Sequence, residues 1–135
     1  MIEFNYETKF ELTDEEGISQ WITGTISEEN CKEGEINYIF CDDEYLHKLN
    51  VEFLDHDTLT DIISFDYSVG SELHGDIYIS IERVQDNAKD YNTDFFTELN
   101  RVIIHGILHY CGYKDKTDED AKTMRAKEDY YLSKI

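Results

Sequence analysis

The sequence predicts an α+β fold, a single domain in which a mixed four-stranded sheet packs on about five helices. Four segments have strand character, at residues 2–6, 35–41, 61–67 and 76–82, and the first alternates apolar and polar side chains with the two-residue period of a half-buried strand. Elsewhere, apolar residues recur at three- and four-residue spacing, which is typical of amphipathic helices. With 135 residues and 40% hydrophobic content, the chain is the size of one ordinary domain and can bury a core. We therefore expect a single domain over residues 1–135.

The first three helices are predicted from capping residues and apolar spacing. Thr13 and Glu16 have the spacing of a capping box. The apolar face of the helix behind them is formed by Ile18, Trp21, Ile22 and Ile26. From Asp42 an acidic first turn leads into a second amphipathic helix, and a short third helix is expected around residues 84–91.

A long apolar helix is expected in the C-terminal half. Residues 92–94 offer cap residues for a helix that starts near Phe95. Its segment 102–108 is apolar nearly all round, so we expect it to lie at the centre of the core. Gly112 is placed to end this helix, and the pattern Thr-x-x-Asp at residues 117–120 opens the last one.

The charge balance restricts the partners that the protein can have. Twelve Lys and Arg stand against 31 Asp and Glu, a net charge of −19. Such a charge repels phosphate backbones and predicts weak non-specific binding to nucleic acid, so no DNA partner is expected. The acidic excess is larger in residues 1–60, net −13, than in residues 61–135, net −6. A polyanion is therefore expected to bind to the C-terminal half.

The sequence favours a cytoplasmic protein without membrane association. The first twelve residues carry no basic and apolar pattern of a signal peptide, and no uncharged apolar run approaches the ~18 residues of a membrane span. The three cysteines, Cys31, Cys41 and Cys111, are few, odd in number and irregularly spaced, which suits a reducing compartment.

Two histidines on the long helix are candidate metal ligands. His105 and His109 are four residues apart, so both imidazoles leave the same helix face. Such a pair alone is more often incidental than a ligand pair. However, Gly112 can turn the chain back across this face, and Asp115 can then bring an oxygen. Two imidazoles, one carboxylate and an open fourth position predict one catalytic zinc ion per chain rather than a closed structural site.

The histidine spacing also resembles that of zinc peptidases. Those enzymes carry a general-base Glu directly after the first histidine, and here Gly106 stands in that position. Glycine cannot take a proton, which counts against a conventional metalloprotease.

Three blocks of the sequence resemble the YbeY family of single-domain, metal-dependent endoribonucleases that mature ribosomal RNA. HGILHYCGYKD at residues 105–115 is similar to the family signature HGxLHxxGYDH. LNVEFLDHDTLTDIISFDY at 49–67 resembles LNxxYRxxDxxTDVLSF, and HGDIYIS at 74–80 resembles a block containing GDIxIS. The resemblance implies a zincin-like metal-binding helix, with His105, His109 and Asp115 as the metal and catalytic residues.

The departures from the family pattern concern the site. Asp115 stands where the family normally has a third His ligand, Lys114 replaces the neighbouring Asp, and Leu54 aligns with the family's active-site arginine. A carboxylate is an acceptable zinc ligand, so the predicted site survives. The candidates to replace the arginine as a phosphate-binding group are Arg83, Lys114, Lys116 and His56.

Three function classes remain open at this stage. The first is a metal-dependent endoribonuclease that cleaves single strands of ribosomal RNA precursors during ribosome biogenesis, with a ribosomal particle presenting the RNA. The second is a metal-dependent peptidase-like hydrolase, and the third is a non-catalytic ribosome-assembly factor with a structural metal. Asp61 and Ser64 of the second block either face a pocket or serve as a strand-end cap and a buried hydroxyl.

Overall fold

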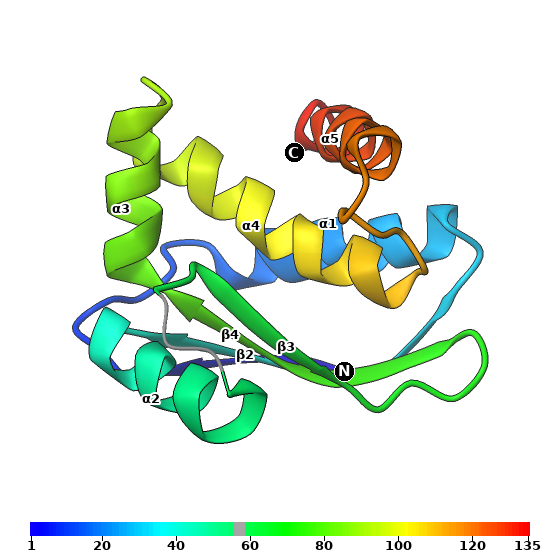
Figure 1. Ribbon diagram of the computed structural model, residues 1–135. Coiled ribbons are helices and arrows are strands. Elements are labelled where there is room, and N and C mark those ends of the chain that lie inside the picture. Colours follow the sequence, from blue (N-terminus) through cyan, green and yellow to red (C-terminus); the bar gives the residue numbers. More distant parts are fainter. Residues whose placement is uncertain (56–58) are drawn as a thin grey trace.

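In residues 1–55 and 59–135, which the computed structural model describes, the chain forms a four-stranded sheet and five helices (Figure 1). The strands, in their order across the sheet, are β1 (Ile2–Tyr6), β2 (Lys32–Cys41), β4 (Glu72–Ser80) and β3 (Ile62–Asp66). β1, β2 and β4 are parallel, and β3 is antiparallel to β4. The predicted fold class, α+β with a mixed four-stranded sheet and about five helices, is confirmed.

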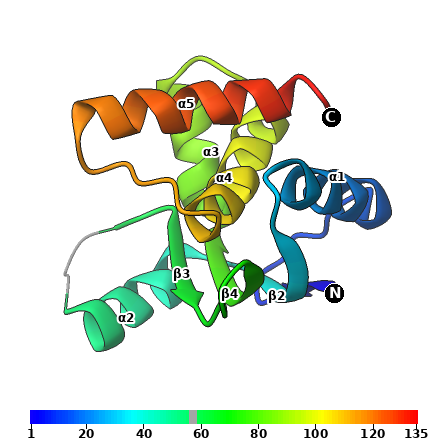
Figure 2. The same ribbon diagram turned by 90° about the vertical axis from the view of Figure 1, so that its right-hand side faces the viewer.

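The helices cover both faces of the sheet. They are α1 (Glu15–Glu28), α2 (Asp43–Leu54), α3 (Ile81–Asp90), α4 (Phe95–Tyr110) and α5 (Asp118–Leu132). α1 and α4 lie on one face, α3 and α5 pack against α4, and α2 lies on the opposite face (Figures 1 and 2). Successive side chains of β4 point to opposite faces of the sheet. Ile77 and Ile79 belong to the core under α1 and α4, whereas Tyr78 packs against a small hydrophobic cluster under α2, formed by Cys41, Leu46 and Ile63.

α4 is the central helix of the domain, as its apolar segment predicts. Nearly every side chain from Val102 to Leu108 is buried, and the hydroxyl of Tyr38 donates a hydrogen bond of 2.8 Å to the carbonyl of Ile103. No helix within the described residues is both long enough and apolar enough to span a membrane.

The caps of α4 and α5 are where the sequence places them, but the cap of α1 is not. The side chain of Asp94 accepts from the amide of Thr97, and that of Thr117 accepts from the amide of Asp120. At α1 the predicted capping box of Thr13 and Glu16 is wrong. The N-cap is Asp14, which accepts a hydrogen bond from Gly17, because a short carboxylate satisfies the free amides of a first turn as well as a threonine does.

The predicted strand at residues 76–82 is displaced by several residues. β4 begins at Glu72, which pairs with Lys32 of β2, so the expected loop is partly strand. It ends at Ser80, whose hydroxyl accepts from the amide of Arg83 and starts α3 at Ile81. The predicted strand extends too far because the apolar alternation continues through Ile81, although Ser80 ends the strand as the N-cap of α3.

Candidate metal centre

His105 and His109 lie on the face of α4 that is turned away from the apolar core. Their ring centroids are 4.7 Å apart, and their side chains are 20% and 34% exposed. This is the arrangement expected for residues one helical turn apart.

A glycine turn brings Asp115 to these imidazoles. α4 ends at Tyr110, and Gly112 adopts φ +106°, a conformation that favours glycine. The amide of Gly112 donates to the carbonyl of His109, and the amide of Tyr113 donates to that of Leu108, which is the Schellman arrangement. The chain therefore folds back over the histidine face, as the sequence predicts for Gly112.

The three candidate ligand atoms converge, and the distance from Asp115 to each imidazole is close to the spacing that zinc requires. Oδ2 of Asp115 lies 3.3 Å from Nε2 of His105 and 3.5 Å from Nε2 of His109, and one ligand atom from each residue lies within 4.8 Å of the others. Two ligand atoms that each lie ~2.0–2.1 Å from a tetrahedral zinc ion are separated by about 3.3–3.4 Å. The donor set therefore fits zinc, with the solvent side of the partly exposed Asp115 available for a further ligand.

Glu128 of α5 orients the first imidazole. Its Oε2 lies 2.6 Å from Nδ1 of His105, while its Oε1 accepts from Arg101 at 3.0 Å. A proton on Nδ1 then points to Glu128 and leaves Nε2 free to face Asp115. Burial lowers the pKa of His105, but the hydrogen bond and charge of Glu128 and the charges of Asp115 and Asp61 outweigh burial and raise it. Glu128 was not predicted as a site residue from the sequence, and the available signal was a carboxylate in helical phase with Met124 and Leu132 on the apolar face of α5.

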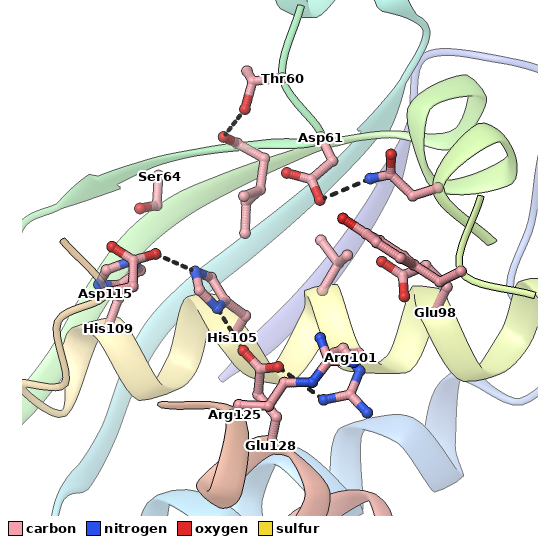
Figure 3. Close-up of a pocket in the computed structure, with 14 residues that line it drawn as sticks. Thr60, Asp61, Ser64, Glu98, Arg101, His105, His109, Asp115, Arg125 and Glu128 are labelled. Carbon is pink, nitrogen blue, oxygen red and sulfur yellow. Dashed lines mark hydrogen bonds and ion pairs between the residues drawn. The ribbon is translucent and has the colours of Figure 1, made fainter. Parts of the chain in front are cut away.

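The candidate ligands line one end of a cavity of about 450 Å³ (Figure 3). One face of α4 lines it, the segment from Thr60 to Ser64 lies across from that face, and α3 and α5 contribute the remaining walls. Asp61 and Ser64 both line this cavity, so they lie at the pocket that the sequence left open for them.

Two further carboxylates lie in the same cavity. Asp61 accepts a hydrogen bond of 3.3 Å from Asn87, and burial raises its pKa despite the opposing charge of His105. Glu98 of α4 is 5% exposed. Burial and then the charge of Asp61 raise its pKa, and the charges of Arg101 and Arg125 only partly offset them.

The cationic groups at the cavity differ from the phosphate-binding candidates that the sequence predicted. Arg83 points to Asp43 and Asp86 and does not line the cavity, nor do the exposed Lys114 and Lys116. His56 lies outside the described residues. The arginines that do line the cavity are Arg101 and Arg125. Arg101 lies one helical turn before His105 on α4, so the four-residue spacing was a signal that the sequence analysis missed. Arg125 could not be identified in this way, because α5 is brought over α4 only by tertiary packing.

Gly106 faces the sheet rather than the candidate ligands. A Cβ atom at this position would lie 3.0 Å from Cδ1 of Ile77 and 3.3 Å from Cδ1 of Ile62. A Glu placed here would point into the apolar core, so the position after the first histidine has no room for the peptidase base.

Comparison with known proteins agrees with the three sequence blocks. The family model described as "Endoribonuclease YbeY" matches residues 2–135. Relatives named endoribonuclease YbeY are 67% identical over 129 residues in Flavobacterium johnsoniae, covering 96% of this chain and 93% of the relative, and 62% identical over 132 residues in Flavobacterium psychrophilum, covering 98% and 94%. The solution structure of TM1509 from Thermotoga maritima aligns with a TM-score of 0.72 and 29% identity, over 98% of this chain and 87% of that one. The chain belongs to the YbeY family of endoribonucleases.

Proposed function

We propose that residues 1–135 form a single metal-dependent endoribonuclease domain that cleaves single-stranded segments of ribosomal RNA precursors. One zinc ion is held by His105, His109 and Asp115. The observation that carries this proposal is the convergence of their three ligand atoms within 4.8 Å of one another, in a cavity of a chain from an endoribonuclease family. Zinc supplies a Lewis acid for a scissile phosphodiester when it is bound there.

The side chains around the cavity perform the remaining tasks. Glu128 holds His105 in one orientation through the 2.6 Å contact with Nδ1. Arg125 places positive charge on the cavity wall, where it can bind a phosphate group, whereas Arg101 lines the same wall but is paired with Glu128 and Asp129. Asp61, whose burial raises its pKa, is the carboxyl group best placed to hold or release a proton in this pocket.

We propose further that a ribosomal particle presents the RNA. The net charge of −13 in residues 1–60 repels free RNA and attracts basic ribosomal proteins. The three cysteines are few, odd in number and irregularly spaced, which supports a reducing, cytoplasmic location.

An activity comparison tests the assignment. The zinc-loaded protein is incubated with single-stranded RNA, duplex RNA and casein, with and without a chelator, alongside the variants His105→Ala and His47→Ala. His47 is a matched control because it lies on α2, on the opposite face of the sheet. We expect cleavage of single-stranded RNA that is lost with the chelator and with His105→Ala but kept with His47→Ala.

Two other results would replace the proposal. Casein fragments indicate a peptidase, which Gly106 and its contacts with Ile77 and Ile62 disfavour. No turnover of any substrate indicates an assembly factor with a structural metal, which Leu54 in place of the family arginine favours.

A further inference from the structure

The cavity at the metal centre extends well beyond the candidate ligands. His105 and His109 lie toward the C-terminal end of α4, whereas Glu98 lies toward its N-terminal end (Figure 3). Tyr91, the C-cap residue of α3, also lines the cavity, and only residues 92–94 separate it from the start of α4, so it belongs to the Glu98 end. Glu98 and His105 are seven residues apart, so they share a helix face and are separated by ~10.5 Å along the axis. The phosphate of a nucleotide and the far edge of its base are separated by a comparable distance.

Glu98 is a buried acceptor that the folded protein does not use. It is 5% exposed and lines the cavity. Within the described part of the chain, no hydrogen bond or ion pair reaches its carboxylate. Every side-chain oxygen or nitrogen there that is fully covered has a hydrogen-bond partner, so the carboxylate oxygens of Glu98 cannot be fully covered. Their small exposed part therefore opens into the cavity. A buried carboxylate loses its hydration unless hydrogen-bond donors replace it, so this position favours a ligand that brings N–H groups.

An aromatic ring stands at the same end of the cavity. Tyr91, the C-cap residue of α3, is 64% exposed and lines the cavity. An exposed ring of this kind is a platform on which a nucleobase can stack. Asp61 and Glu98 are the two carboxylates at this end of the cavity. Asp61 already accepts a hydrogen bond from Asn87, whereas Glu98 has no donor among the described residues.

We propose that Glu98 and Tyr91 form a nucleobase subsite that selects guanine, which deepens the proposed endoribonuclease function and rests on it. Guanine alone among the four RNA bases presents two adjacent N–H donors, N1–H and N2–H, on its Watson–Crick edge. An ionised carboxylate accepts both at once. Adenine and cytosine place a ring-nitrogen acceptor beside their amino group, and that nitrogen repels the second carboxylate oxygen. Stacking on Tyr91 holds any base, and Glu98 supplies the selection.

Calorimetric titration with nucleoside 5′-monophosphates tests the subsite, because these probes contain no phosphodiester that can be cleaved. The zinc-loaded protein is titrated at pH 8 with guanosine, inosine, adenosine, cytidine and uridine monophosphates. Inosine is guanine without its amino group, so it removes one donor and leaves the protein unchanged. We expect guanosine monophosphate to bind roughly 5- to 150-fold more tightly than adenosine monophosphate, with inosine monophosphate in between.

Variants separate selection from stacking. Glu98→Gln should remove the guanine preference, whereas Glu52→Gln, the same change at an exposed position of α2, should keep it. Tyr91→Ala should weaken all five ligands by roughly 5- to 150-fold, and Tyr91→Phe should not. The melting curve of each variant is checked first, and the inosine comparison holds even if Glu98→Gln does not fold.

Equal dissociation constants for the five ligands, or a guanine preference that survives in folded Glu98→Gln, overturn the subsite. The titration and the cleavage assay together distinguish a failure of the subsite from a failure of the proposed function. Metal-dependent cleavage of RNA without a base preference leaves the function intact and rejects the subsite. A guanine preference in a protein that cleaves no RNA supports the subsite and rejects the nuclease.

Discussion

Nδ1 of His105 lies 2.6 Å from Oε2 of Glu128, a carboxylate that comes from a different helix and is 6% exposed. The other oxygen of Glu128 accepts from Arg101 of α4, which also pairs with Asp129 at 2.7 Å. α5 is thus fastened to α4 beside the candidate metal ligands, and the orientation of one imidazole depends on that packing.

We expect Glu128→Gln to lower zinc affinity by about 10- to 100-fold, the usual effect of losing a carboxylate that orients a ligating histidine. Asp129→Asn is the matched control, because Asp129 also pairs with Arg101 but has no contact with His105 among the interactions of the described residues. Competition with a fluorescent zinc chelator measures both affinities. Equal zinc affinities in the two variants would show that Glu128 does not contribute to zinc binding.

Asp115 should behave as a ligand rather than as a base. Asp115→His, which introduces the residue normal for the family, should keep one zinc per chain and most of the activity. Asp115→Ala should weaken zinc binding, because the oxygen that lies 3.3 Å and 3.5 Å from the two imidazoles is lost. Asp118→Ala, at the exposed start of α5, is the control.

Elemental analysis and a pH–rate profile distinguish the two roles of Asp115. If it acts as a base, Asp115→His keeps the metal but cuts turnover by roughly 10²–10⁴-fold and alters the profile. If Asp115→Ala binds zinc as tightly as the parent protein, the proposed ligand set is wrong.

Removal of zinc should lower the melting temperature. The ligands come from α4 and from the turn that follows it, so an ion bound there stabilises the folded state only. At a free zinc concentration 100 times the dissociation constant, the stabilisation is ~2.7 kcal/mol. Calorimetry with and without a chelator measures it, and the double variant His105→Ala, His109→Ala should melt identically under both conditions. An unchanged curve for verified apo wild type contradicts a stabilising role for the metal.

Glu29 should stabilise the turn that carries Asp115. Its carboxylate accepts hydrogen bonds from Tyr131, from Tyr113 at 2.7 Å and from Lys127 at 3.1 Å. Burial raises the pKa of Glu29, but these three donors outweigh burial and lower it. Because the folded-state pKa is depressed, the stabilisation is complete above the ordinary value of 4.5 and is lost as the pH falls through the folded-state pKa.

Chemical denaturation across a pH series measures this contribution. Glu29→Gln should unfold about 1–3 kcal/mol more easily than wild type at pH 7, and the difference should shrink below about pH 4.5. Glu16→Gln, an exposed change in α1, the helix that Glu29 caps, should leave stability within ~0.5 kcal/mol of wild type. A difference for Glu29→Gln that does not depend on pH would rule out the ionised carboxylate as its source.

Local sequence signals predicted most of the elements. Asp94 and Thr117 mark helix starts because a side-chain oxygen satisfies an amide only two or three residues away, and Gly112 marks a helix end because its positive φ is favoured by glycine. The start of β4 at Glu72 was missed, because it depends on pairing with Lys32, forty residues away, and no local pattern encodes that pairing.

The sequence by itself determined the fold class, the family and the three residues proposed as ligands. The ligands could be predicted because His105, His109 and Asp115 all lie within eleven residues joined by a helix and one turn. Only the tertiary structure decided what surrounds them. Glu128 and Arg125 reach the cavity from α5, and Asp61 reaches it from the residue before β3. Glu98 has a buried carboxylate because those elements close over α4. Backbone hydrogen bonds over a few residues fix the first group, whereas burial of apolar surface between distant segments brings the second group together.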